Sequence, residues 1–304
     1  MGSRNNLLRH APAQVKKIIN LITSRTLWIT ILSFSAFAVP ASIHSFIWRK
    51  QGITEQSDLV AILVFLIAIV INLIIAGKLL SFKEVGLQRK AFGRSFIYSF
   101  FFVLVLRLAP DLIYGKTIYS GVNNQLTFFS LILLVLTPFY EELLFRGIIF
   151  RVWEKSRGFI AAMLVSTILF GLEHLVYPFW GFGDWSIYTV LRPVIFAPVF
   201  ILVAYRTGNI WGLSLSHFLY NASVKLTNDS SPTGGSPESY FIVLLGFTLF
   251  LPVVIDSIDH RVFKTKQSKI NWHKFFSWMF IVIFFSILAN SLFGDILFPI
   301  SSGG

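Results

Sequence analysis

Two adjacent glutamates and an arginine interrupt one of the most apolar stretches of the chain, "PFYEELLFRG" at residues 138–147. An ionised side chain near the centre of a bilayer costs about 2.5–3.5 kcal/mol on insertion scales. In a helix, Glu142 and Arg146 lie four residues apart on one face and can pair. Glu141 is rotated by about 100° from Glu142 and stays outside that pair. A desolvated carboxylate without a cation beside it suits a general base. A structural ion pair between helices explains the same residues equally well.

Two later apolar stretches repeat the four-residue spacing of polar or aromatic side chains. Phe170 and His174 in "FGLEH" share a helical face, so that the phenyl ring can flank the imidazole. His217 and Asn221 in "SHFLYN" place two hydrogen-bond donors side by side. Taken singly, each pair is explained by a buried histidine or by polar contacts between transmembrane helices. Glu173 points away from His174 and needs a different partner.

Taken together, Glu141, His174, His217 and Asn221 lie on three stretches close in sequence and well inside each of them. Counted at about 1.5 Å per residue from the expected cytoplasmic ends, the depths are roughly 15 Å for Glu141, 24 Å for His174 and 12 Å for His217. His174 therefore lies further out than the other two, unless its helix tilts or starts deeper. A carboxylate, two imidazoles and an amide meet the needs of peptide hydrolysis, which are a base for water and donors for an oxyanion.

The elements that must position these residues are predicted from hydropathy. Hydrophobic residues make up 55% of the 304 positions and charged residues only 13%, whereas soluble domains carry about 25% charged residues. The mean hydropathy is +0.72. Apolar runs of the length that crosses a bilayer recur along the chain, which predicts an all-α transmembrane helix bundle of eight or nine spans. Their expected ranges are 26–48, 58–80, 94–113, 126–150, 158–177, 187–205, 209–223, 240–258 and 275–298.

The net charge of +12 follows the expected spans rather than one patch. Basic residues gather before the first span and after the second, fourth and eighth, while the intervening loops hold few. This positive-inside pattern predicts a cytoplasmic N-terminus and favours anionic lipid headgroups over nucleic acid as a partner. We expect the first span to be retained, although Ala36-Phe37-Ala38 loosely mimics a signal cleavage site. The chain has no cysteine, which excludes thiol chemistry.

The three motifs, in this order and on separate apolar helices, resemble the CPBP family. This family comprises intramembrane glutamic proteases, including the type II CAAX prenyl endopeptidases and the bacterial Abi-type proteins. The segment "YRTGNIWGLSLSHFLYNA" around the third motif is also similar to the family. The resemblance covers residues 125–225, about one third of the chain. It divides the chain into a cytoplasmic segment with three spans at 1–124, a catalytic core at 125–225, and an outer loop with two spans at 226–304.

The resemblance implies a role for each motif residue. Glu141 and His174 would activate a water molecule, and His217 with Asn221 would hold the oxyanion. Glu142 and Arg146 would brace the site, with Phe170 beside them. It implies no metal and no cofactor, and a membrane protein or a lipidated peptide as substrate.

Other interpretations remain open from the sequence. Intramembrane ionisable residues also mark transport pathways, although the paired broken helices of many transporters are not evident. A non-catalytic scaffold could use the same polar cavity. Two histidines and a glutamate could ligate zinc, although the chain has no His-Glu-x-x-His segment. A further buried ion pair is predicted between Glu173 and Arg192, and Arg107 and Asp111, four residues apart, are a competing local pair.

Overall fold

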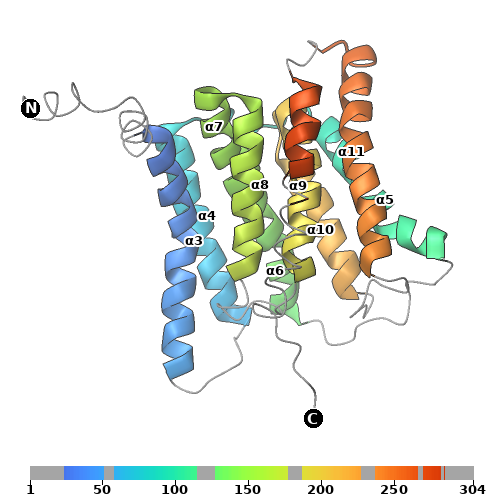
Figure 1. The fold of residues 1–304 in the computed structure, drawn as a ribbon. Coiled ribbons are helices and arrows are strands. Elements are labelled where there is room, and N and C mark those ends of the chain that lie inside the picture. Colours follow the sequence, from blue (N-terminus) through green and yellow to red (C-terminus); the bar gives the residue numbers. More distant parts are fainter. Residues whose placement is uncertain are drawn as a thin grey trace, which may run out of the picture.

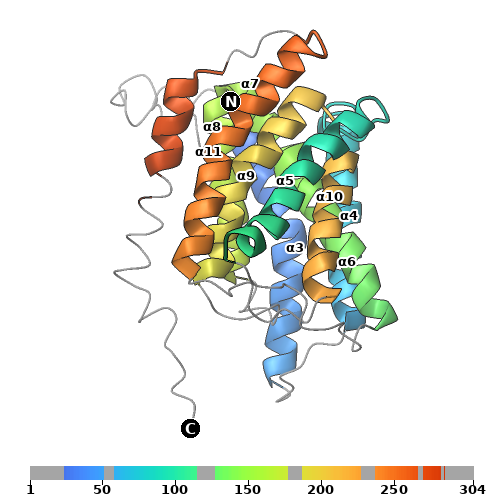
Figure 2. The same ribbon diagram turned by 90° about the vertical axis from the view of Figure 1, so that its right-hand side faces the viewer.

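The computed structural model describes residues 24–50, 58–114, 127–176, 187–226, 237–265, 270–281 and 284. Within these ranges the chain forms helices and no strand. The helices run roughly along a common direction and pack into a bundle, as Figures 1 and 2 show. The predicted all-α architecture is confirmed.

The first eight predicted apolar stretches coincide with helices to within a few residues, except that the stretch beginning near residue 126 continues to Arg157. Most of the ninth, 275–298, lies outside the described residues. The elements are α3 (Arg25–Lys50), α4 (Asp58–Leu79), α5 (Phe92–Tyr114), α6 (Phe128–Glu141), η1 (Glu142–Ile149), α7 (Phe150–Arg157), α8 (Phe159–Val176), α9 (Ile187–Thr207), α10 (Trp211–Leu226) and α11 (Pro237–Arg261). A further helical segment covers 272–281.

Among the described residues, three helical stretches are long and apolar enough to cross a membrane by length and composition, namely Arg25–Ile43, Asp58–Leu79 and Phe128–Arg157. Two shorter apolar helices cover Phe159–His174 and Pro193–Thr207. Large apolar side chains also lie exposed on the outside of the bundle, as expected for a surface that faces lipid. The number of crossings, eight or nine, stays a prediction.

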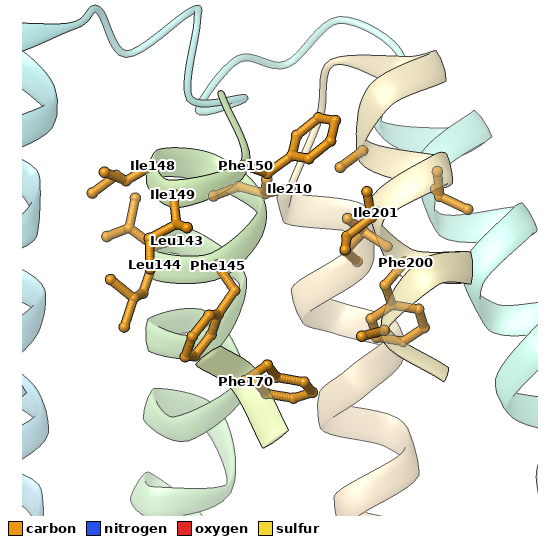
Figure 3. Packing of buried hydrophobic residues seen from close by; sticks show 14 of the residues in the cluster. Leu143, Leu144, Phe145, Ile148, Ile149, Phe150, Phe170, Phe200, Ile201 and Ile210 are labelled. Carbon is orange, nitrogen blue, oxygen red and sulfur yellow. The ribbon is translucent and has the colours of Figure 1, made fainter. Parts of the chain in front are cut away.

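The centre of the bundle is η1, whose eight residues are all buried. Helices α3, α4, α8 and α9 all contact it. Apolar side chains of η1 fill the surrounding space, and Figure 3 shows Leu143, Leu144, Phe145, Ile148 and Ile149 packed there. The ionisable residues of the first motif are therefore held in the interior of the bundle and away from its lipid-facing surface.

Local sequence explains where the helices beside the site begin. Thr127 caps α6, because its side chain accepts a hydrogen bond from the backbone N–H of Ser130 at 3.1 Å. Asn209 plays the same part for α10, since its Oδ1 accepts from the N–H of Gly212 at 3.0 Å. Such caps satisfy helix-end donors that have no partner within the helix.

Candidate active site

The two glutamates lie where α6 passes into η1. Their residue exposures are only 2% for Glu141 and 0% for Glu142. Arg146, also fully buried, places its Nε 3.4 Å from Glu142 Oε2. Its guanidinium lies over the ring of Phe170, with the Cζ atom 4.2 Å from the ring centroid. The ion pair predicted from the four-residue spacing is present, and the arginine gains a cation–π contact as well.

The helix that carries this pair is a π-helix over Glu142–Ile149, whereas an α-helical spacing was assumed from the sequence. Hydrogen bonds from i to i+5 widen the turn and reduce the rotation between successive residues. Glu141 and Glu142, expected to point in different directions, both reach the imidazole of His217. Its Nδ1 lies 3.0 Å from Glu142 Oε1, and its Nε2 lies 3.5 Å from Glu141 Oε2.

His174 faces the other oxygen of Glu141, with its Nε2 4.0 Å from Oε1. Its Nδ1 lies 2.9 Å from the carbonyl oxygen of Phe170. The Phe170 ring packs edge-on against the imidazole, with centroids 4.6 Å apart, as the shared helical face predicts. A carbonyl can only accept, so Nδ1 carries the proton and the Nε2 of neutral His174 presents a lone pair toward Glu141.

The structure thus brings together Glu141, His174 and His217 from α6, α8 and α10. The greater depth estimated for His174 does not separate it from Glu141, because the helical stretch that carries Glu141 continues beyond residue 151 to Arg157. Asn221 follows His217 by one turn and is partly exposed. In the described part of the chain, no hydrogen bond or ion pair links Asn221 to the other three residues. Its role as an oxyanion donor stays a prediction.

Aromatic rings enclose the polar group. Phe200 packs against His217 with ring centroids 5.7 Å apart, and Arg146 Cζ lies 5.6 Å from the same phenyl ring. Phe145 and Phe170 close a further side, at 5.0 Å. Figure 3 shows Phe145 and Phe170 close together, with Phe200 on a neighbouring helix. Charges within such an apolar enclosure interact more strongly than they would in water.

Glu173 meets a partner that the sequence reasoning missed. The hydroxyl of Tyr140 donates to Glu173 Oε1 at 2.8 Å, and both side chains are buried. The side chains of Arg192 and Asp111 lie outside the described residues. Both predicted ion pairs, Glu173 with Arg192 and Arg107 with Asp111, therefore stay predictions.

A second charged cluster, also missed, joins three helices away from these motifs. Arg94 of α5 and Arg206 of α9 both bind Asp259 of α11, at 3.1 and 3.0 Å. Arg206 also contacts Asp256 at 3.3 Å. Arg94 and Arg206 fall at the ends of their apolar stretches, where a basic residue is interpreted as part of the positive-inside pattern. The sequence does not reveal the carboxylate with which each arginine pairs.

The glutamate and histidine side chains of the three motifs are residue types that can also bind a metal ion. Among the residues described, no group of three or more His, Asp or Glu side chains is arranged to hold a metal ion. Metal-independent chemistry stays a prediction that needs its own test.

Comparison with known proteins bears on the segment that contains all three motifs. No curated protein and no solved structure matches the chain. Residues 123–223 match the family model described as "Type II CAAX prenyl endopeptidase Rce1-like". This segment includes Glu141, His174, His217 and Asn221, and it overlaps the 125–225 range of the resemblance. The family match therefore confirms the resemblance inferred from the spacing of Glu141, His174 and His217.

Proposed function

We propose that this protein is an intramembrane endopeptidase that hydrolyses a peptide bond of a membrane-associated or lipidated protein. The observation that carries the proposal is that the two carboxylate oxygens of Glu141 face two different histidines. Oε1 faces His174 at 4.0 Å and Oε2 faces His217 at 3.5 Å. The match to a CAAX prenyl endopeptidase family supports the same reaction class.

Glu141 and His174 are suited to activate water. The 4.0 Å between Oε1 and Nε2 is too long for a direct hydrogen bond. Both atoms can accept, so a water molecule placed against them would donate one proton to each. Its oxygen lone pair would then point away from the two acceptors and toward a substrate carbonyl. A base must lie within hydrogen-bond reach of the proton it removes.

The reaction balances with these groups alone. The water oxygen forms a bond to the carbonyl carbon as its proton passes to Glu141, and the carbonyl oxygen becomes an oxyanion. When the intermediate collapses, the C–N bond breaks and Glu141 returns the proton to the departing amine. Because one carboxylate both takes and gives the proton, the enzyme ends each cycle in its starting state.

Oxyanion stabilisation falls to His217 and Asn221 in this proposal. Histidine donates from both ring nitrogens only when it is protonated. Glu142 lies 3.0 Å from Nδ1 and would hold that proton in place, so that a protonated Nε2 could turn its hydrogen bond from Glu141 to the oxyanion. Glu142 then has two tasks, pairing with Arg146 and orienting His217. Preorganised donors of this kind contribute about 2.7–4 kcal/mol each to lowering a barrier.

The test compares protein termini in membranes of cells that express the wild type or Glu141→Gln. Mass spectrometry of N- and C-terminal peptides is expected to show termini that appear with the wild type alone. Peptides with a prenylated cysteine near the new terminus would identify the substrate class. Identical termini with both proteins at equal expression would overturn the endopeptidase and favour a scaffold that binds without cutting.

A further inference from the structure

Two buried polar residues outside the proposed chemistry lie next to it in sequence. Tyr140 immediately precedes Glu141 on α6, and Glu173 immediately precedes His174 on α8. The Tyr140 hydroxyl donates to Glu173 Oε1 at 2.8 Å, and both residues have 0% exposure. A hydrogen bond therefore connects the two helices at the level of the Glu141–His174 pair.

The tyrosine end of this bond is fixed by packing. The Tyr140 ring lies 5.0 Å from the ring of Phe37 on α3 and 5.4 Å from that of Phe65 on α4, measured between centroids. A tyrosine side chain has few rotatable bonds, so packing against two rings leaves its hydroxyl one position. Glu173, and with it the end of α8, is thereby held against α3, α4 and α6.

The catalytic pair needs such support, because no direct hydrogen bond sets its spacing. His174 Nε2 and Glu141 Oε1 are 4.0 Å apart. A water molecule between them would keep both of its hydrogen bonds only while this distance is maintained. Another hydrogen bond of α8, from Ser166 Oγ to the carbonyl oxygen of Phe145 on η1 at 2.9 Å, lies eight residues before His174. Eight residues correspond to about 12 Å along a helix, so this hydrogen bond is too far along α8 to set the distance between His174 and Glu141 by itself.

We infer that Tyr140 and Glu173 form a positioning pair that sets His174 against Glu141 for water activation. The inference rests on the proposed function. Neither residue touches the substrate or gives a proton to it. Their bond holds two neighbours of the reacting groups at a fixed separation, and misplacement of such groups by about 1 Å can cost 10²-fold in rate.

The kinetic test uses the full-length protein in liposomes and a farnesylated CAAX-type peptide as the probe. Tyr140→Phe and Glu173→Leu each remove the bond, and each is expected to lower kcat about 10- to 100-fold with KM unchanged. Glu173→Gln keeps an oxygen that can accept from Tyr140, and it should recover part of the loss. The double variant Tyr140→Phe/Glu173→Leu should lose no more than either single variant.

Ser166→Ala is the matched control, since it removes another hydrogen bond of α8, to the η1 segment that continues α6. It should lower the unfolding temperature as much as Tyr140→Phe does, with kcat near the wild-type value. Equal losses of kcat in Ser166→Ala and Tyr140→Phe would show a merely structural role and overturn the inference. Wild-type kcat in folded Tyr140→Phe would overturn it too.

A spectroscopic arm separates this inference from the proposed function. Histidine side-chain ¹⁵N resonances, with His174 assigned through His174→Gln, report the surroundings of the ring without any turnover. Tyr140→Phe and Glu173→Gln should shift the His174 resonances and leave those of His217 in place. If the wild type leaves the peptide uncut, the proposed substrate class fails while this shift still tests the positioning pair. Unchanged His174 resonances in both variants would refute the pair.

Discussion

At the residue scale, Glu142 contacts two other charged or titratable members of the site. One carboxylate oxygen binds Arg146 and the other binds His217. The sequence predicted the first contact from the four-residue spacing. The second contact depends on a helix far along the chain and on the π-helical turn, and neither is visible in local spacing. Glu142 therefore has two roles: it stabilises the site by pairing with Arg146, and it orients the imidazole of His217.

Substitutions at Glu142 should separate these two tasks. Glu142→Leu leaves Arg146 buried without its carboxylate, and we expect a loss of about 3–5 kcal/mol in the free energy of unfolding. The double variant Glu142→Leu/Arg146→Met replaces the pair with apolar side chains and should recover most of that stability. It should stay poorly active, because His217 Nδ1 has lost its acceptor. Unfolding in denaturant and peptide cleavage, measured on the same preparations, check both parts. Full activity in the double variant would contradict the orienting role.

Catalysis is expected to need no metal ion. A catalytic zinc site commonly uses three protein ligands and an open position, and ligation by Glu141, His174 and His217 would occupy the base and one oxyanion donor. Treatment with a strong chelator should leave activity unchanged, and added zinc, cobalt or manganese should not raise it. Activity lost on chelation and regained with stoichiometric metal would replace the glutamate mechanism with a metal-assisted one.

At the element scale, the residue ranges of the helices could be predicted from the sequence. The packing of the helices against one another could be predicted only in part. Apolar runs fixed the ends of α4 and α8 to within a residue or two, because the period and length of hydrophobic segments determine helices in a membrane. The π-helix was not predicted, although Pro138 before it is a signal of irregularity. The depth estimate set His174 apart from Glu141 because it counted the depth of Glu141 from residue 151, whereas that helical stretch continues to Arg157. Contacts such as Tyr140 with Glu173 depend on packing between helices and leave no trace in spacing.

The close approach of α10 to α5 gives a test of how His217 is positioned. A Cβ atom at Gly212 would collide with the backbone N of Phe96 and lie 2.8 Å from the carbonyl oxygen of Phe92. Gly212→Ala must therefore push α10 away from α5 and move His217, which lies further along the same helix. We expect a loss of activity together with a lower unfolding temperature.

Gly246→Ala in α11 is the matched control, because a Cβ atom there meets nothing within 4 Å. Alanine is favoured over glycine inside a helix by about 1 kcal/mol, so this variant should be at least as stable as the wild type and fully active. Thermal unfolding and peptide cleavage compare the two substitutions. Normal cleavage by Gly212→Ala would show that the contact between α5 and α10 has no part in placing His217.

At the scale of the whole molecule, helices outside the matched segment hold it in place. Arg94 on α5 and Asp259 on α11 lie outside residues 123–223, whereas Arg206 on α9 lies inside. Their cluster links the three helices through contacts of 3.0 and 3.1 Å. The motifs could predict the chemistry of the core without reference to these helices. The partners of Arg94 and Arg206 could not be found, because they are far apart in sequence.

Asp259→Asn should destabilise the whole bundle, since it removes the negative charge shared by two arginines. We expect about 3–5 kcal/mol for breaking a buried ion pair, measured by unfolding in denaturant, with kcat of the remaining folded protein little changed. Glu84→Gln removes the half-exposed partner of Lys155, whose ammonium lies 2.8 Å away, and an exposed pair contributes only about 0–1 kcal/mol. Equal stability of the two variants would show that the buried cluster adds nothing beyond a surface pair.

The most direct measurement of the central claim is the kcat of purified Glu141→Gln in liposomes, assayed with the farnesylated peptide in H₂¹⁸O. The wild type is expected to cleave the peptide and place ¹⁸O in the new carboxylate. Glutamine keeps the size of the side chain and removes the base, so kcat should fall by about 10²–10⁴-fold, the usual contribution of a general base. Thermal unfolding near the wild-type temperature would establish that the variant is folded. Near-normal turnover by folded Glu141→Gln would contradict the assignment of Glu141 as the base.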